Sequence, residues 1–241
     1  MLGRLPKIAI TGLLLAQLVG IASLAADKAK NPPVAAHSPV DLATEDTTND
    51  KEWNTWLQTF ENVTREIYNQ RSSIMKGLEL RPGMDVADIG SGTGFYTFLI
   101  AKEIAPNGKI YAVDINKTFL KHIEQKAKAQ GIKQMRTVLC TKKSVGLPAN
   151  SIDLAFVCDT YHYLEYPKST VVSIRKALRS NGRLVVIDPD RRPDKSSEWV
   201  MKNVRTGKKE FIAEIESAGF RKVKEADFLK ENFMATFVKS K

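Results

Sequence analysis

The chain has 241 residues, of which 43% are hydrophobic and 27% are charged, the proportions of an ordinary globular protein. This composition excludes collagen-like, wholly disordered and multi-span membrane proteins. The 37 Lys and Arg residues exceed the 27 Asp and Glu residues, and the resulting net charge of +10 is compatible with an anionic partner. Two cysteines, Cys140 and Cys158, are too few for a disulfide scaffold or a four-cysteine metal site.

The first 25 residues have the layout of a secretory signal peptide. Arg4 and Lys7 precede an uncharged apolar stretch over residues 8–26, and Ser23-Leu24-Ala25 provides a small-residue cleavage site. The alternative is an uncleaved membrane anchor, because the nineteen residues of that stretch can just span a bilayer. In either case the sequence predicts that the rest of the chain is exported, and that it is periplasmic or secreted if the signal is cleaved.

Residues 26–49 separate this segment from the folded part of the chain. They contain three prolines and no aromatic residue, which predicts a disordered linker. The folded domain is therefore expected over residues 50–241, which is the size of one domain. Its first part, residues 50–80, carries apolar residues such as Trp53 and Phe60 at helical spacing.

Beyond residue 81, short apolar runs alternate with helical segments. We expect strands near residues 85–89, 109–115, 135–140, 152–158, 183–188, 221–226 and 233–238, and helices near residues 95–104, 116–130, 167–178 and 196–218. Near-continuous Val, Ile and Leu strands that alternate with helices predict a parallel sheet covered on both faces. Because no helix separates the last two runs, they are expected to form an antiparallel pair at one edge.

A glycine-rich loop joins the first predicted strand to the next helix. In Asp88-Ile89-Gly90-Ser91-Gly92-Thr93-Gly94 the glycines let the backbone turn tightly and approach a ligand, at which helix N–H groups then point. Asp114 ends the next strand, twenty residues after Gly94, where a carboxylate can accept both ribose hydroxyls. The third glycine of a dinucleotide fingerprint is missing, since residue 95 is Phe, and no Gly-Lys-Ser/Thr follows as in a P-loop.

This G-x-G-x-G pattern, with Asp88 two residues before the first glycine, resembles motif I of the class I S-adenosylmethionine-dependent methyltransferases. The resemblance covers roughly residues 60–240 and is nearest to small, often exported bacterial methyltransferases related to those of ubiquinone and menaquinone biosynthesis. It implies an α/β, Rossmann-like sheet of seven strands in the order 3-2-1-4-5-7-6 with helices on both faces. It also implies S-adenosyl-L-methionine as cofactor, with the methionine part along Asp88, Gly90, Ser91, Gly92, Thr93 and Gly94, the ribose on Asp114 and the adenine beside Ile115.

The loop after the third strand departs from the family's pattern. In the family it commonly supplies an acidic residue to the adenine amino group, but residues 140–144 read Cys-Thr-Lys-Lys-Ser and contain none. Thr141 or Ser144 can still form a hydrogen bond there. We therefore expect Thr141 to border the cofactor.

The acceptor is expected beyond the carboxyl ends of the strands, at the switch point in strand order. Asp159, Tyr161 and His162 follow the fourth strand there, and residues 188–192 follow the fifth. We expect Asp159 beside the cofactor and His162 and Tyr161 as candidate catalytic residues, because an imidazole near neutrality can remove a proton from the acceptor. The alternative for His162 is a loop hydrogen bond between packed tyrosines.

Arg65, Tyr68 and Arg71 recur three residues apart before the first strand and share roughly one helix face. In this fold such a helix can cap the substrate cleft. A polar face exposed to solvent is the equal alternative.

The fourth strand ends in Cys158-Asp159-Thr160-Tyr161 rather than the Asn/Asp-Pro-Pro-aromatic motif typical of enzymes that methylate amino groups of nucleic acids. This favours O- or C-methylation of a small-molecule acceptor and leaves sulfur and other nitrogen acceptors open. One alternative is a catalytically inactive module of the same fold that binds S-adenosylmethionine or S-adenosylhomocysteine. A third hypothesis, aminopropyl transfer, lacks a clear set of diamine-binding acids in residues 159–162.

The basic residues occur in scattered clusters without interleaved aromatic residues, which favours a solvated surface over a nucleic-acid site. A weak contact with an anionic membrane surface is compatible with them. No set of metal ligands is predicted, and the oligomeric state is left open.

The implied strand order separates the third and fourth strands by two others. Cys140 and Cys158 are therefore expected roughly 14 Å apart at about 4.8 Å per strand step, whereas a disulfide needs α-carbons within about 7 Å. We predict two free thiols, with Cys158 as a buried packing residue.

Overall fold

A computed structural model of the protein describes residues 50–240. The predicted signal peptide, residues 1–25, and the predicted linker, residues 26–49, lie outside the described residues. Within residues 50–240, no helix is both long and apolar enough to cross a membrane.

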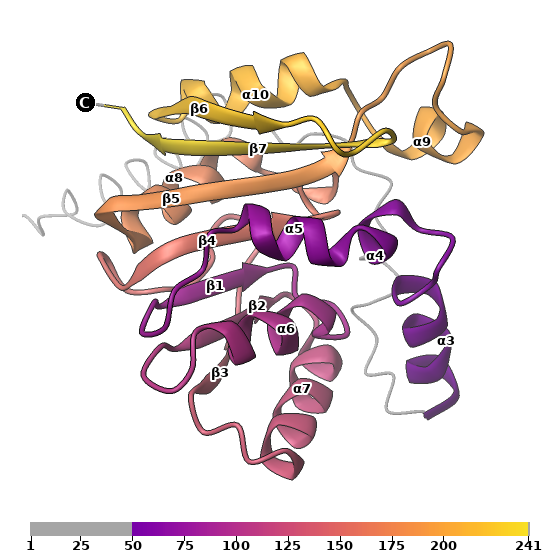
Figure 1. The fold of residues 1–241 in the computed structure, drawn as a ribbon. Helices are drawn as coiled ribbons and strands as arrows, with labels where there is room; N and C mark the ends of the chain where they lie inside the picture. Colours follow the sequence, from indigo (N-terminus) through magenta and orange to yellow (C-terminus); the bar gives the residue numbers. More distant parts are fainter. Residues whose placement is uncertain (1–49, 241) are drawn as a thin grey trace, which may run out of the picture. The chain divides into compact units, whose positions relative to one another are not determined.

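The described residues form one mixed sheet of seven strands in the order β3-β2-β1-β4-β5-β7-β6 (Figure 1). The strands are β1 (Val86–Ile89), β2 (Ile110–Asp114), β3 (Met135–Leu139), β4 (Ile152–Cys158), β5 (Leu178–Pro189), β6 (Phe220–Ala226) and β7 (Asn232–Lys239). The predicted fold class and strand order are confirmed.

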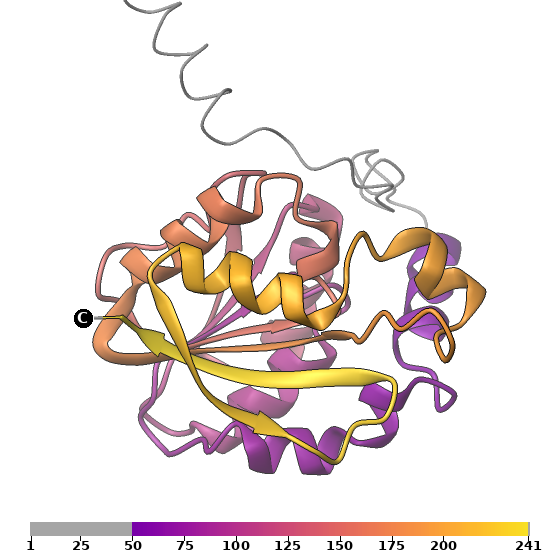
Figure 2. The same ribbon diagram turned by 90° about the horizontal axis from the view of Figure 1, so that it is seen from above.

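The first five strands are parallel, and β7 runs antiparallel to both of its neighbours, β5 and β6. The antiparallel pair therefore lies at one edge, as predicted (Figure 2). The strand order switches between β1 and β4: β2 and β3 are added on one side of β1, and β4 and β5 on the other. β1 and β4 are hydrogen-bonded neighbours, with Val86 opposite Leu154. This switch point is where open parallel sheets bind their ligands.

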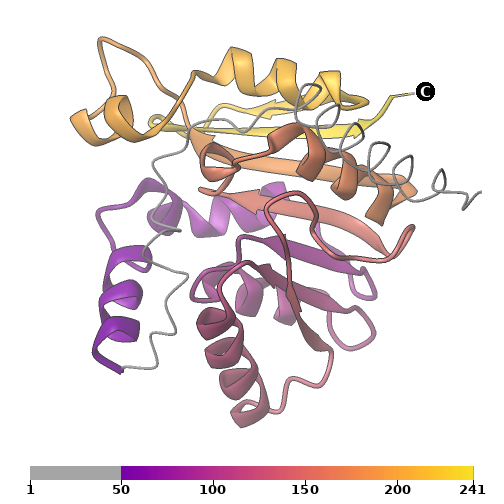
Figure 3. The same ribbon diagram turned by 180° about the vertical axis from the view of Figure 1, so that it is seen from behind.

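Helices cover both faces of the sheet because the central strands are apolar on both sides. The nine helical segments among the described residues are α3 (Asp50–Phe60), α4 (Glu66–Asn69), α5 (Arg71–Gly77), α6 (Phe95–Glu103), α7 (Lys117–Ala129), the short η1 (Tyr161–Tyr163), α8 (Pro167–Ala177), α9 (Glu198–Asn203) and α10 (Lys208–Ser217). One core packs α5, α6 and α7 on the face that includes Val86 and Phe156. The other packs α8 and α10 on the face that includes Ala87 and Val157, and Figure 3 views the molecule from that side.

The helical expectations for residues 50–80 and 196–218 each need a correction, because both stretches are interrupted. In the first, the Asn62 side chain accepts the backbone N–H of Thr64 at 2.9 Å, and this turn separates α3 from α4. In the second, residues 204–207 include the weak helix formers Val204, Thr206 and Gly207, and Val204 is extended and buried. The chain consequently forms α9 and α10 with a bend between them, and α9 lies with α3 and α4 at the carboxyl end of β5 (Figures 1 and 3).

Candidate active site

The glycine loop, residues 90–94, turns at the carboxyl end of β1. Gly90, Gly92 and Gly94 have φ angles of +74°, +51° and +82°, which residues with a side chain rarely adopt. A Cβ at Gly90 would lie 2.3 Å from side-chain atoms of Thr160, in the loop after β4. The glycine loop therefore touches the loop after β4 at the switch point of the sheet.

Asp114 ends β2 beside the glycine loop. One carboxylate oxygen accepts the backbone N–H of Gly92 at 2.8 Å, and the other accepts that of Asn116 at 2.9 Å. The side chain is buried, and burial raises the pKa of Asp114 above its ordinary value. A carboxylate can accept about four hydrogen bonds, so the two oxygens retain lone pairs for two ribose hydroxyls. Ile115 follows immediately and is half-buried.

Two further polar groups of the loop region are buried. Ser91 Oγ has no hydrogen-bond partner among the described residues, which leaves a donor and acceptor for a ligand. Asp88 accepts the Thr97 hydroxyl at 2.5 Å, and its pKa is raised to about 7, chiefly by burial and further by the charge of Asp114. Thr93, also buried, donates its hydroxyl to Glu61 at 3.1 Å.

Helix α3 covers the glycine loop, a contact that was not predicted from the sequence. The Phe60 ring would lie 3.4 Å from a Cβ at Gly92, and it packs edge-on at 6.2 Å from Phe119 of α7. Trp56 also contacts Phe119, and Trp53 stacks at 4.0 Å on the His122 ring. The only sequence signal was the run of aromatic residues in α3, which also fits an ordinary buried helix.

The loop after β3 lies next to Asp114, because the backbone N–H of Cys140 donates to the Asp114 carbonyl at 2.9 Å. Thr141 is exposed, and its hydroxyl accepts the backbone N–H of Ser144 at 3.1 Å within the same turn. Lys142 forms an ion pair at 2.5 Å with Glu165, from the segment before α8. The turn therefore lies beside Asp114 with the Thr141 hydroxyl already engaged, and a contact of Thr141 with the cofactor stays a prediction.

Asp159 follows β4 with a φ angle of +52° and forms an ion pair with Arg65 at the start of α4. Arg65 thus reaches the loop after β4, as the cleft-capping alternative expects. The other two members of its predicted face do not. Tyr68 stacks at 4.9 Å on Phe95, and the exposed Arg71 lies over the Tyr68 ring.

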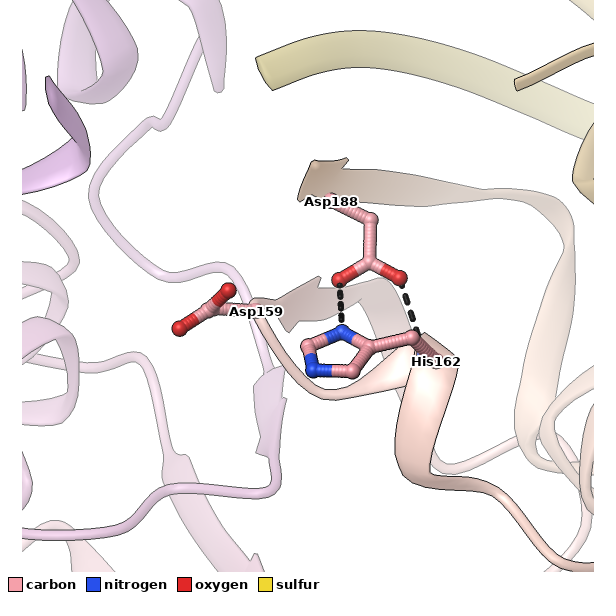
Figure 4. A group of neighbouring side chains, drawn as sticks. All are labelled: Asp159, His162 and Asp188. Atoms are coloured by element: carbon pink, nitrogen blue, oxygen red, sulfur yellow. Dashed lines mark hydrogen bonds and ion pairs between the residues drawn. The ribbon is translucent and has the colours of Figure 1, made fainter. Parts of the chain in front are cut away.

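His162 and Asp188 form a fully buried pair across the ends of β4 and β5 (Figure 4). His162 Nδ1 lies 2.8 Å from one oxygen of Asp188, and the backbone N–H of His162 donates to the other oxygen at 2.8 Å.

The Tyr161 side chain points away from this pair. It is buried against Phe211, and its hydroxyl donates to Glu214 of α10 at 3.3 Å, so the geometry gives no support for a catalytic Tyr161.

The spacing of three side chains, Asp159, His162 and Asp188, would allow a metal ion to bind between them. One possible ligand atom from each lies within 4.8 Å of the others (Figure 4). Their carboxylates already have partners, however. Both oxygens of Asp188 accept hydrogen bonds from His162, and Asp159 is paired with Arg65. Because the carboxylate oxygens of both acids already have hydrogen-bond or ion-pair partners, we assign no metal to this cluster.

Both cysteines are free thiols, as predicted. Two strands separate β3 from β4 in the sheet, and burial raises the pKa of Cys140 to about 12 and that of Cys158 well above its ordinary value. A thiol that resists ionisation is a poor nucleophile. Both side chains are half-buried and pack against the edges of the two cores, so Cys158 is a packing residue but is not fully buried as predicted.

Comparison with known proteins decides the family. A model of the methyltransferase domain family, described as "Methyltransferase domain", matches residues 80–237, more than half of the 241-residue chain. The chain belongs to this family. It is a class I S-adenosylmethionine-dependent methyltransferase, distantly related to the methyltransferases of ubiquinone and menaquinone biosynthesis, and S-adenosylmethionine is its cofactor.

The methyltransferase is 30% identical over 83 residues to a demethylmenaquinone methyltransferase of Geobacillus stearothermophilus, a match that covers 34% of this chain and 36% of the relative. It is 28% identical over 109 residues to a ubiquinone/menaquinone biosynthesis C-methyltransferase of Burkholderia cenocepacia, covering 45% and 44% of the two chains. The matched segments thus span less than half the length of these curated relatives.

Among solved structures, an S-adenosylmethionine-dependent methyltransferase from Aquifex aeolicus has a TM-score of 0.67 at 23% identity, covering 76% of this chain and 96% of its own. A protein from Bordetella parapertussis, described as a possible exported protein, has a TM-score of 0.57 at 16% identity, covering 72% of this chain and 68% of its own. At these identities the likeness establishes the fold.

The residues at the site fit the cofactor. The glycine loop presents backbone without side chains, Ser91 Oγ is buried with no partner among the described residues, and Asp114 keeps acceptor capacity at the end of β2. Residues of the glycine loop, Asp114 and Ile115 would hold S-adenosylmethionine. When bound, this cofactor supplies an electrophilic methyl group on a sulfonium.

Proposed function

We propose that the methyltransferase transfers a methyl group to an oxygen or carbon atom of a small-molecule acceptor. The observation that carries the proposal is the close approach of the glycine loop to the loop after β4. Side-chain atoms of Thr160 lie 2.3 Å from the position that a Cβ would take at Gly90. An acceptor beside that loop meets residues 158–163, whose sequence lacks the motif for methylating base amines. The names of the two curated relatives, one of them a C-methyltransferase, support a small-molecule acceptor.

Calorimetric titration of the full chain with S-adenosylmethionine and S-adenosylhomocysteine tests the cofactor half of the proposal. We expect both compounds to bind. If neither binds at millimolar concentration, the cofactor half of the proposal is wrong. A labelled-methyl transfer screen against a small-molecule extract tests the second half. Cofactor binding with no labelled product in any fraction would favour the alternative, a catalytically inactive binding module.

We expect Asp114→Ala to weaken binding of S-adenosylhomocysteine by about 1.5–3 kcal/mol, the range for hydrogen bonds to a charged group. The reason is the loss of the acceptor for the ribose and of the bond that holds Gly92. The matched control is Asp153→Ala, which removes a carboxylate that also accepts a backbone N–H, that of Asp85 at 2.8 Å, but lies at the opposite end of the strands. Equal affinities of the wild type and Asp114→Ala would contradict the ribose role.

We also propose that residues 1–25 direct export, with an anchor formed by residues 8–26 as the alternative. The likeness to a Bordetella protein described as possibly exported supports export. N-terminal sequencing of the chain recovered from the producing cells separates the signal from the anchor, because a mature end near Ala26 requires cleavage. An intact Met1 in the membrane fraction would favour the anchor.

A further inference from the structure

The buried pair of His162 and Asp188 holds the imidazole in one orientation. Asp188 is 0% exposed and His162 is 1% exposed. The two oxygens of the Asp188 carboxylate form hydrogen bonds with Nδ1 and with the backbone N–H of His162, each at 2.8 Å. The second ring nitrogen, Nε2, is buried and has no hydrogen-bond partner among the described residues. A buried polar atom without a partner is unusual and points to a ligand that completes it.

We propose that Asp188 is a positioning residue that fixes the proton of neutral His162 on Nδ1, so that Nε2 accepts a proton from a hydroxyl-bearing acceptor during methyl transfer. The inference rests on the proposed function and specifies its acceptor class. A hydroxyl must lose its proton when it gains a methyl group, whereas a tertiary amine or thioether needs no base. A dedicated acceptor nitrogen therefore indicates an acceptor of the first kind.

The surroundings of His162 agree with this assignment. The Tyr163 ring lies 3.8 Å from the imidazole, and Trp199 of α9 meets it edge-on at 6.0 Å. Asp159, whose side chain is 20% exposed, lies on the loop that precedes His162, and a carboxylate oxygen lies within 4.8 Å of the imidazole. Because this carboxylate is the partly exposed member of the cluster, we place the acceptor on its side of the imidazole.

The step balances without any further reactant. The hydroxyl oxygen forms a bond to the methyl carbon, the carbon–sulfur bond of the cofactor breaks and its electron pair stays on sulfur. The hydroxyl proton moves to Nε2 of His162, which carries it as imidazolium paired with Asp188 and releases it to solvent after the product leaves. Asp188 stays ionised throughout and changes no bond.

The charges around the imidazole set its pH dependence. Burial lowers the pKa of His162, but the charge and hydrogen bond of Asp188 outweigh burial and raise it above the ordinary value. Asp159 raises the pKa further and Arg205 lowers it. Arg65, which pairs with Asp159, and Tyr163, whose ring contacts the imidazole, also lie at this face, and Cys158 and Tyr161 lie close enough to Asp188 to interact with its charge. Because only the neutral imidazole accepts a proton, activity should rise with pH through a value above 6.5.

Nuclear magnetic resonance of the full chain labelled with ¹⁵N-histidine tests the positioning role without any substrate. The chain has three histidines, so the spectrum of His162→Gln assigns the signal of His162. We expect a residue that titrates above pH 6.5 and whose neutral form carries its proton on Nδ1. A neutral form protonated on Nε2 would overturn the proposal.

Asp188→Asn should change this signature in a defined way. Asp188 now accepts from two donors, the backbone N–H and the Nδ1–H of His162. An asparagine has one acceptor oxygen, which the backbone N–H needs, so its NH₂ group faces Nδ1. Nδ1 must then act as an acceptor, which favours the tautomer with the proton on Nε2. With the negative charge removed, burial also moves the titration below pH 6.5. The matched control is Asp190→Asn, two residues along the chain, whose carboxylate pairs with Arg192 at 3.7 Å and which should leave the His162 signal unchanged.

Kinetics with a series of substituted phenols of decreasing pKa test the proton transfer. We expect His162→Gln and Asp188→Asn to lower kcat by about 10²–10⁴-fold for weakly acidic phenols, with cofactor affinity kept within threefold. For phenols already ionised at the assay pH the loss should shrink towards onefold. An equal loss across the series would show that His162 has only a structural role.

The outcomes separate this inference from the proposed function. Methyl transfer to trimethylamine-type or thioether probes but to no phenol would overturn the acceptor class while leaving methyl transfer intact. Absence of transfer to every probe, with S-adenosylhomocysteine bound, would count against the proposed function and against proton transfer to Nε2. The histidine spectra would still decide the role of Asp188.

Discussion

Gly90→Ala is expected to destabilise the fold by about 2–5 kcal/mol and to reduce S-adenosylhomocysteine binding at least tenfold. A φ angle of +74° costs an alanine about 1–2 kcal/mol. The new Cβ would also lie 2.3 Å from Oγ1 and Cγ2 of Thr160 and 2.8 Å from its Cβ, so rotation of the threonine side chain cannot relieve the contact. Forcing atoms into a packed site typically costs a further 1–3 kcal/mol. Urea unfolding and calorimetric titration measure the two effects.

Gly83→Ala is the matched control for backbone strain alone. Its φ angle is +87°, and among residues 50–240, its two chain neighbours aside, no heavy atom lies within 4 Å of its Cβ position. It should therefore lose about 1–2 kcal/mol and keep its cofactor affinity. In Gly90→Ala combined with Thr160→Ala, part of the clash disappears, so the double variant should be more stable than the sum of the single effects. Equal losses for Gly90→Ala and Gly83→Ala would mean that the contact with Thr160 is unimportant.

Much of this region could be predicted because its signals are local in sequence. The glycines of residues 90–94 report the backbone angles that the loop requires, and Asp114 stands at a fixed distance behind them. The strands are apolar runs bounded by turns, so their positions and the antiparallel edge followed from the pattern. The family resemblance then supplied the strand order, which periodicity alone does not contain.

The remaining contacts could not be predicted because they join elements that are distant in sequence. Asp188 binds His162 from 26 residues away, and Arg65 reaches Asp159 from 94 residues away. Both pairings depend on how the loops after β4 and β5 and the start of α4 are packed. The pattern also could not tell which way Tyr161 points, since a buried tyrosine and a catalytic one look alike in sequence.

Asp88→Asn is expected to remove a pH dependence of stability from the wild type. The folded pKa of Asp88 is about 7 against an ordinary 3.8, chiefly because of burial. Between these values the folded state binds more protons than the unfolded state, so stability falls as the pH rises from about 4 to about 7. Three pKa units correspond to roughly 4 kcal/mol, of which about 2–3 kcal/mol falls between pH 5 and pH 8.

Urea unfolding of the wild type and Asp88→Asn at pH 5, 6, 7 and 8 measures this effect. From pH 5 to pH 8, the free energy of unfolding of the variant should rise by about 2–3 kcal/mol relative to that of the wild type. The cost of the unpaired amide does not depend on pH and so does not affect this difference. Thr97→Val removes the hydroxyl that lowers the pKa of Asp88, so in that variant the fall in stability should extend to higher pH. Parallel pH profiles of the wild type and Asp88→Asn would contradict the raised pKa.

The same carboxyl group links cofactor binding to protons. The family resemblance sets Asp88 along the methionine part of the cofactor, whose ammonium group favours the ionised carboxylate. Because the free protein holds a proton on Asp88 below about pH 7, binding must release it. Affinity for S-adenosylhomocysteine should then rise up to about tenfold from pH 6 to pH 8 in the wild type and stay flat in Asp88→Asn. Calorimetry in buffers of different ionisation enthalpy counts the released protons, and a count of zero at pH 6 would place the ammonium group away from Asp88.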